Sequence, residues 1–297
     1  MKLVVAGSSG LVGTALVPRL SADGHSVVRL VRGPVGDASM VTWDPSGGSV
    51  PPNLLDDVDA VVNLCGSNIA AGRWTEARKL ELRESRLRTT EALVTALDSA
   101  VRRPRVLINA SAVGIYGDRD NEVLTETSSA GGGFLANLCK DWEAAALKAR
   151  ASDVRVVCLR IGVVMSGRGG ALRKLVPVFR AGLGGRLGDG RAWMSWISCE
   201  DLVRAILFVL GNASIEGPVN AVSPEPLRNR QFTETLAAAL NRRAFFPMPA
   251  ALLELIYGEM ARETLLASCR AMPGVLRDKG FGYRFPDLPG ALLDTLG

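Results

Sequence analysis

The chain has 297 residues, 47% of them hydrophobic and 22% charged, and carries a formal net charge of +5. Charged residues interrupt every apolar run well before the roughly 20 residues that a membrane span needs, so neither a transmembrane helix nor a membrane partner is expected. Basic residues alternate with glutamates along RWTEARKLELRESRLR instead of forming a stripe with aromatics, so a nucleic-acid partner is not expected either.

The predicted elements start with a βαβ unit at the beginning of the chain. KLVVAG indicates a strand, LVGTALVPRLSADG a helix and HSVVRLVR a second strand. Further strands are predicted over DAVVNLCG, RVLINAS and VRVVCLRIGVVM, with helices over TEARKLELRESRLRTTEALVTALDSA and FLANLCKDWEAAALKAR between them. Strands that alternate with helices favour an α/β protein with a doubly wound, parallel sheet of the Rossmann type.

The regular alternation weakens after about Arg168, where glycine-rich stretches and short helices separated by prolines follow. We therefore expect residues 1–168 to form the Rossmann domain, with later segments returning to its sheet. Residues 169–297 are expected to form a smaller, mostly helical C-terminal lobe on the substrate side.

The segment GSSGLVG, residues 7–13, follows the first strand directly and opens the first helix. Gly7 permits a tight turn, Gly10 lets backbone N–H groups approach a pyrophosphate, and Gly13 allows close packing of helix on strand. This strand-turn-helix setting predicts a dinucleotide site. The residues expected to contact the dinucleotide here are Gly7, Ser9, Gly10, Leu11, Val12 and Gly13.

The end of the second strand indicates which dinucleotide is bound. An NAD site places Asp or Glu there to hold the ribose 2′-hydroxyl, whereas this chain has Arg32, with Arg29 nearby. The guanidinium of Arg32 offers a planar donor fork to a 2′-phosphate, and Arg29 is interpreted as a surface strand residue. NADP(H) is therefore the expected cofactor.

Cysteine and histidine usage argues against a metal site. The single histidine, His25, follows a glycine in a predicted turn, and the cysteines form no C-x-x-C pair, so buried reduced thiols are expected. The N-terminus MKLVVAG lacks the long apolar stretch of a secretory signal, which indicates a cytoplasmic protein. The five cysteines are Cys65, Cys139, Cys158, Cys199 and Cys269.

The motifs together resemble those of an extended short-chain dehydrogenase/reductase: GxxGxxG, then VVNLCG, ASAVGIYG and RIGVVM after successive strands. More narrowly, AGRW, SRLRTTEAL, LCKDWEAAA, FRAGLGGRLGDGR and GEMARETLLASCRAMPGVLRDKGF resemble the atypical NAD-dependent epimerase/dehydratase-like "epimerase family" proteins. Those proteins end in a small C-terminal domain of unknown function. The resemblance covers nearly the whole chain.

The resemblance implies a Rossmann fold with NADP(H) bound along the glycine segment and at further positions. Small residues at the end of VVNLCG would leave room for the nucleotide. Arg86 lies on a long predicted helix, where it could instead be an exposed ion-pair partner, and for Glu81 the two interpretations are equally open. The further positions implied are Val31, Arg32, Leu64, Cys65, Gly66, Glu81, Arg86 and Val164.

The segment SAVGIYGDRD raises the question of the catalytic acid, because Asp120 stands four residues after Tyr116 where a Tyr-x-x-x-Lys pair would have lysine. By resemblance, this segment is the earlier strand end whose serine, here Ser111, hydrogen-bonds the substrate oxygen. The usual Tyr-x-x-x-Lys lies on the following helix, and alignment on Glu143 puts Leu135 at the tyrosine position and Cys139 at the lysine position. Leucine donates no proton, so the standard acid is missing.

Ser111 and Tyr116 are the candidate catalytic residues, and Asp141 is a weaker one. Ser111 could instead cap the strand end, and Tyr116 could be an ordinary packed aromatic. Trp196, Asp201 and Arg191 could line an outer pocket. A tryptophan in an apolar segment is, however, more often a core residue.

Two functions are compatible with these residues. The first is an NADP(H)-dependent oxidoreductase or epimerase that acts on a nucleotide-sugar or another carbonyl or hydroxyl substrate. The alternative is a non-catalytic NADP(H)-binding regulator, related by resemblance to cell division, that acts through a protein partner. A homodimer is also compatible with the sequence.

Overall fold

A seven-stranded sheet forms the centre of the computed structural model, which describes residues 1–45 and 50–296. Each strand of this sheet runs parallel to its neighbours, as the alternation of strands and helices predicts. From one edge to the other the strands are β11 (Gly217–Ala221), β7 (Arg155–Ile161), β5 (Val106–Ala112), β4 (Ala60–Asn63), β1 (Lys2–Ala6), β2 (Ser26–Val31) and β3 (Met40–Thr42).

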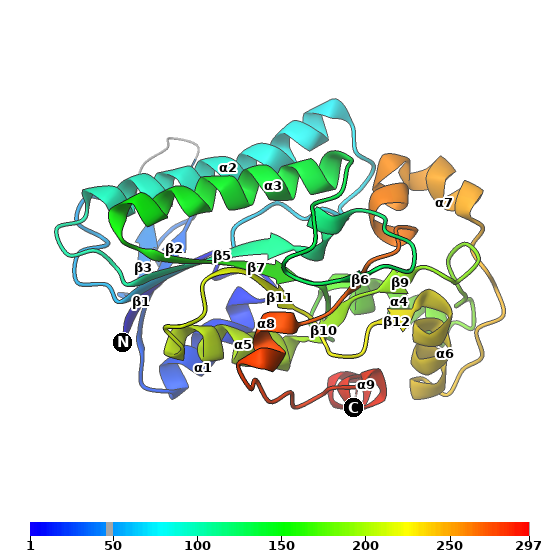
Figure 1. The fold of residues 1–297 in the computed structure, drawn as a ribbon. Helices are drawn as coiled ribbons and strands as arrows, with labels where there is room; N and C mark the ends of the chain where they lie inside the picture. The colour runs from blue at the N-terminus through cyan, green and yellow to red at the C-terminus, as the bar shows by residue number, and fades with distance from the viewer. Residues whose placement is uncertain (46–49, 297) are drawn as a thin grey trace.

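Helices cover both faces of the sheet (Figure 1). Two long helices lie side by side over one face, and two others pack together on the opposite face. The first pair is α2 (Glu76–Ser99) and α3 (Phe134–Leu147), and the second is α1 (Gly13–Ala22) and α5 (Cys199–Gly211).

Alternate residues of each central strand enter different cores, because successive side chains of a strand point to opposite faces. In β1, Leu3 and Val5 pack with Leu16 of α1, whereas Val4 packs with Leu93 of α2. All five side chains are fully buried. Burial of an aliphatic side chain of this size contributes about 1.5–3 kcal/mol, so these layers hold the sheet between its helices.

The sheet does not end with the predicted Rossmann domain. Strand β11 pairs with β7 at one edge although it lies at residues 217–221. At the other edge, β3 is a short strand that the sequence pattern does not predict. The main sheet therefore contains strands from both residues 1–168 and residues 169–297.

The remaining elements form short sheets and helices around the carboxyl ends of the main strands (Figure 1). β8 (Val163–Met165) pairs with β10 (Trp196–Ser198), β9 (Trp193–Met194) with β12 (Leu227–Arg228), and β6 (Val123–Leu124) with β13 (Arg270–Ala271). The helices are α4 (Gly170–Arg180), α6 (Asn229–Ala239), α7 (Ala250–Tyr257), α8 (Gly274–Asp278) and α9 (Leu288–Leu296). Within the described residues, no helix is both long enough and apolar enough to cross a membrane.

Candidate cofactor and substrate site

The glycine turn after β1 is packed so closely that side chains are excluded. Gly7 has φ +80°, and a β-carbon there would lie 2.6 Å from the carbonyl carbon of Leu64 at the end of β4. A β-carbon at Gly13 would lie 2.3 Å from the carbonyl oxygen of Gly7. Helix α1 then begins without a side-chain cap or an acidic residue in its first turn. A helix start of this kind can accept an anion such as a pyrophosphate.

Arg32 follows the last residue of β2 and is exposed. Among the described residues it has no carboxylate partner, whereas Arg29 donates to Asp37 at 2.7 Å. Burial raises the pKa of Cys65, after β4, to about 12, and the charge of Arg32 acts in the opposite direction. The charge of Arg32 therefore acts at the end of β4, and within the described residues it is not neutralised by an ion pair.

Helix α4 begins against the glycine turn. β-Carbons at Gly169 and Gly170 would lie 2.9 and 3.1 Å from the side chain of Leu11, and the second would also lie 3.5 Å from the carbonyl oxygen of Val164. The structure thus brings two of the predicted cofactor residues together from segments more than 150 positions apart.

Arg86 of α2 is held against the loop that follows β4. Its guanidinium donates to the carbonyl oxygens of Leu82 at 3.0 Å and Ser67 at 3.1 Å, and it stacks over Trp142 at 5.1 Å. A β-carbon at Gly66 would lie 3.0 Å from this guanidinium. Burial lowers the pKa of Arg86, and no carboxylate partners it among the described residues. Arg86 is therefore a fixed cation at the predicted cofactor edge, not an exposed ion-pair partner.

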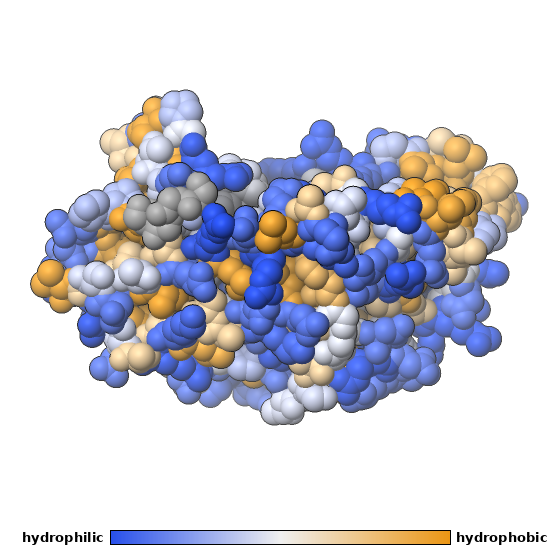
Figure 2. Space-filling view, turned by 90° about the horizontal axis from the view of Figure 1, so that it is seen from above, coloured by the Kyte–Doolittle hydropathy of each residue, from blue (hydrophilic) through white to orange (hydrophobic). Residues whose placement is uncertain are grey.

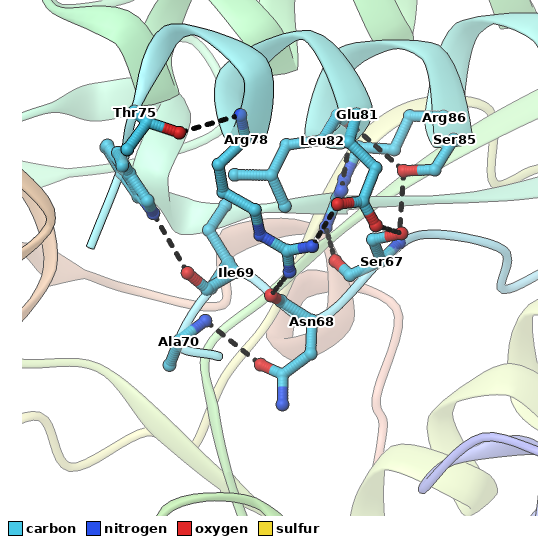
Figure 3. Close-up of polar contacts among 11 residues, drawn as sticks. Ser67, Asn68, Ile69, Ala70, Thr75, Arg78, Glu81, Leu82, Ser85 and Arg86 are labelled. Atoms are coloured by element: carbon cyan, nitrogen blue, oxygen red, sulfur yellow. Dashed lines mark hydrogen bonds and ion pairs between the residues drawn. The ribbon is translucent and has the colours of Figure 1, made fainter. Parts of the chain in front are cut away.

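Glu81 closes the same loop from the exposed side of α2 (Figure 3). Its carboxylate accepts from Arg78 and from the hydroxyl of Ser67 at 2.9 Å, and both contacts hold the pKa of Glu81 below its usual value. Arg78 also donates to the carbonyl oxygen of Asn68. These bonds tie the loop to the first turns of α2, so Glu81 shapes the predicted cofactor edge through Ser67.

The side chain of Ser111 belongs to a buried hydrogen-bond network at the carboxyl ends of β5 and β7. Its hydroxyl donates to Glu143 at 2.7 Å, and Glu143 forms a two-bond ion pair with Arg160, with both distances 2.9 Å. Burial alone would lower the pKa of Arg160. The hydrogen bonds to Glu143 and the negative charge of that carboxylate outweigh burial, so the pKa of Arg160 is raised. The serine hydroxyl is thus fixed in one orientation.

Tyr116 belongs to the same network and is fully buried. Its hydroxyl accepts from Arg160 at 2.9 Å and donates to Asn220 of β11 at 2.7 Å, and it lies 3.0 Å from the carbonyl oxygen of Thr125. Burial raises the pKa of Tyr116. The observed role of Tyr116 is that of a packed, hydrogen-bonded aromatic, which is the alternative that the sequence left open. Its catalytic assignment remains a prediction that these contacts do not favour.

The first turn of α3 presents no proton donor at Leu135, which is buried against Gly114. Its backbone N–H and that of Phe134 donate to the carboxylate of Glu263 at 2.7 and 2.9 Å. One turn further along, burial raises the pKa of the Cys139 thiol to about 12. The C-terminal lobe therefore caps the helix on which the usual acid is missing.

The other candidates lie outside this group. Asp141 forms an ion pair with Arg83 on the outer faces of α3 and α2. Trp196 and Asp201 are fully buried, so they do not line an outer pocket: Trp196 belongs to a core cluster of the C-terminal lobe, and Asp201 accepts from the backbone N–H groups of Arg284 and Phe285. Arg191 is exposed beside Asp189. The buried indole reflects packing of an apolar strand rather than a ligand site.

Neither of two cavities of about 280 and 470 Å³ contains a predicted site residue: one borders residues 50–56 and α2, the other α1 and α5. Across residues 1–45 and 50–296, no cluster of three or more His, Cys, Asp or Glu side chains could hold a metal ion. The predicted cofactor residues therefore lie outside both cavities, at the glycine turn, at the strand ends beside it and on α2.

The ion pair of Arg160 with Glu143 and the contact of Glu263 with the start of α3 differ in how well the sequence alone could have predicted them. Arg160 is one of two charges, with Arg155, inside the apolar run VRVVCLRIGVVM, and a buried charge requires a partner, so Arg160 carried a usable signal. Glu263 lies 129 positions after its contact on α3, and its own segment gives no sign of that role.

Comparisons with known proteins show which family the chain resembles. Residues 3–221 match the model of the NAD dependent epimerase/dehydratase family, and residues 248–295 match a domain of unknown function, DUF1731. The epimerase family protein Mb2239 of Mycobacterium bovis is 46% identical over 98% of this chain and 96% of its own length. The human epimerase family protein SDR39U1 is 36% identical over the full length of both chains.

Solved structures share the overall fold. A crystal structure of human SDR39U1 (isoform 2) with NADPH has a TM-score of 0.92 and 34% identity, and the match covers 99% of each chain. A nucleoside-diphosphate sugar epimerase from Corynebacterium glutamicum has a TM-score of 0.83 and 36% identity, over all of this chain and 58% of that one. UDP-N-acetylglucosamine 4-epimerase from Bacillus cereus, at 18% identity and a TM-score of 0.72, shares the fold.

Proposed function

The chain belongs to the NAD-dependent epimerase/dehydratase family, and we propose that it is an NADP(H)-dependent protein of the oxidoreductase or epimerase type. Its substrate carries a carbonyl or hydroxyl group, as a nucleotide-sugar does. The relative named as a nucleoside-diphosphate sugar epimerase supports this substrate class.

The observation that carries the proposal is the glycine turn beside a free arginine. Gly7 and Gly13 leave no space for a β-carbon, and α1 begins uncapped, so the backbone fits a pyrophosphate. Arg32 follows β2, and no salt bridge is formed by it within the described residues, so a 2′-phosphate could accept its hydrogen bonds. NADPH in the structure of the human relative supports the same cofactor for this chain.

Bound NADP(H) would supply hydride exchange with a substrate carbon. Ser111 is the residue that we assign to the substrate oxygen. Because its proton is donated to Glu143, the serine oxygen offers its remaining lone pairs, which suit a substrate hydroxyl that donates a hydrogen bond. Tyr116 acts as a positioning residue, since it reaches Ser111 through Arg160 and Glu143.

A second function, a non-catalytic NADP(H)-binding regulator with a protein partner, is favoured by the first turn of α3. Leu135 offers no proton there, and positioned proton transfer is worth about 10²- to 10⁴-fold in rate. Glu263 of the C-terminal lobe binds the start of this helix directly. Cofactor binding near α3 would then favour one conformation of the C-terminal lobe, and a protein partner would bind that conformation.

Two measurements on the purified chain separate these functions. NADPH affinity is measured first by calorimetric titration, and the nicotinamide absorbance is then followed with a panel of nucleotide-sugars, simple carbonyls and alcohols. Turnover that falls at least about 10²-fold in Ser111→Ala, with unchanged NADPH affinity, is expected for the enzyme. Ser99→Ala, at the end of α2, is the matched control and should leave turnover unchanged.

Tight NADPH binding without turnover of any panel member would favour the regulator. Failure to bind NADPH would remove both functions, because each depends on the glycine turn and Arg32. Tyr116→Phe should lower turnover less than Ser111→Ala does, since Tyr116 acts through two other residues; an equal loss would contradict its positioning role.

A further inference from the structure

Two segments of the C-terminal lobe are basic without a compensating acid. Residues 170–188 and 235–253 contain six arginines and lysines and no aspartate or glutamate. All six basic side chains are exposed, and none of them forms an ion pair within the part of the chain that the structure describes. They are Arg173, Lys174, Arg180, Arg186, Arg242 and Arg243.

The acids that flank these segments in the sequence have basic partners of their own. Asp189 pairs with Arg191, Glu234 with Arg230 and Glu254 with Arg262, at 3.8, 4.0 and 3.3 Å. The six basic side chains therefore carry charge that the neighbouring acids do not neutralise.

The fold joins the two segments into one continuous part of the surface. The guanidinium of Arg242 donates to the carbonyl oxygen of Arg180, the last residue of α4, at 3.0 Å. The backbone N–H of Met248 donates to the carbonyl oxygen of Arg186 at 2.8 Å. The end of α4, the loop after it and the stretch before α7 thus lie side by side.

Large apolar side chains are exposed in the same part of the molecule. Of the thirteen that are exposed among the described residues, seven lie between residues 178 and 256, so this region is apolar as well as basic. Phe245 is 67% exposed, and Leu255, on α7, is 72% exposed. Figure 2 shows hydrophobic side chains clustered at the end of the molecule that α7 forms in Figure 1. We call the exposed side chains of residues 173–186, 242–246 and 252–256 the basic apolar surface.

The fold fixes the direction in which α7 points. Leu253 is buried on the inner side of the helix, and Tyr257 packs against the core cluster that contains Trp74. Arg73, in the loop before α2, donates to the carbonyl oxygen of Leu255 at 3.3 Å. The opposite, apolar face of α7 is therefore held outward by contacts with the Rossmann half.

This combination of side chains fits the surface of an anionic bilayer. Aromatic and aliphatic side chains insert at the boundary between headgroups and acyl chains, and arginine and lysine attract anionic lipids. A peptide recognised by its side chains would need pockets, and neither of the two cavities described above borders this surface. A nucleic acid would use the basic and aromatic groups but leave Leu255 and Ile256 uncovered.

We propose that the chain binds anionic phospholipid membranes through the basic apolar surface. Phe245, Phe246 and the outer face of α7 enter the headgroup region, and the six basic side chains contact lipid phosphates. The expectation of no membrane partner rests on the lack of a long apolar run, which binding in the plane of a bilayer does not require. The proposal does not depend on catalysis or on NADP(H).

Co-sedimentation of the full chain with extruded vesicles tests this proposal. The chain should bind vesicles of equal parts phosphatidylglycerol and phosphatidylcholine more tightly than phosphatidylcholine alone, and added salt should weaken the binding by screening the charges. Arg243→Glu should raise the dissociation constant at least about fivefold, because a basic residue near the membrane contributes about that factor. Phe245→Ser should raise it at least about tenfold, because a phenyl ring no longer enters the apolar boundary.

Two exposed residues elsewhere provide matched controls. Leu293→Ser replaces a leucine of α9 that is 77% exposed, and Lys279→Glu, just after α8, changes the net charge as Arg243→Glu does. Both controls should bind vesicles as the wild-type chain does. Thermal unfolding of all four variants checks that each is folded.

Binding that is no tighter to the anionic vesicles than to phosphatidylcholine would overturn the proposal. So would an equal loss in Lys279→Glu and Arg243→Glu, because net charge rather than this surface would then be responsible. A chain that ignores the vesicles but binds polyglutamate, and no longer does so as Arg243→Glu, would overturn it in favour of an acidic protein partner.

Discussion

Replacing Arg160 by methionine should destabilise the protein strongly. The side chains of Arg160 and Glu143 are each only 9% exposed, and two hydrogen bonds of 2.9 Å join them. Removing one partner of such a pair leaves an uncompensated buried charge, which costs about 3–5 kcal/mol. At about 2 °C per kcal/mol for a chain of this size, the melting temperature should fall by about 6 to 10 °C.

Urea unfolding at neutral pH measures this loss, and the double variant Arg160→Met, Glu143→Leu tests its cause. Because the double variant removes both charges, it should recover a large part of the stability lost in the single variant. A single variant that loses less than about 1 kcal/mol, or a double variant as unstable as the single one, would refute the reasoning that the pair is a buried, mutually compensating unit.

Three further outcomes are expected. Arg32→Asp should shift preference from NADPH towards NADH by at least about tenfold in dissociation constant, because it removes the donor for the 2′-phosphate; unchanged selectivity would reject that assignment. Gly133→Ala should lower stability by about 1–3 kcal/mol, because φ is +94° and the new β-carbon would lie 2.6 Å from the carboxylate of Glu263, whereas Gly132→Ala, which meets nothing within 4 Å, should not. Burial raises the pKa of Cys158 from 9.0 to about 12, so the unfolded chain loses this proton first and the free energy of unfolding should fall as pH rises above 9, by up to about 1.4 kcal/mol per pH unit for this thiol. Urea unfolding at mildly and strongly alkaline pH should show a shallower fall for Cys158→Ala, and an equal fall would contradict this origin.

The main sheet could be predicted because its strands are short apolar runs separated by long helices. Its edges could not. Strand β3 has three residues and β11 contains glycine, proline and asparagine, so neither run is apolar enough to be recognised, and pairing with a neighbouring strand determines both.

The close packing of the glycine turn could be predicted for a different reason. Gly7 and Gly13 must be glycine for steric reasons that act within a few residues, and Arg32 follows its strand directly. The burial of Tyr116 could not be predicted, because its partners Arg160 and Asn220 come from two strands far along the chain. Long-range hydrogen bonds of this kind become visible only when the strands are placed side by side.

The contact between Glu263 and helix α3 also limits how this chain can be recombined. The segment that matches the domain of unknown function, residues 248–295, contributes the carboxylate, and the epimerase-like segment contributes the glycine at 133 that makes room for it. A chimaera that joined either half to a foreign one would leave two amides of a long helix unpaired, or would press a side chain against a charge. The two segments are therefore expected to be inherited as a matched pair, and designers who graft one should carry over the other.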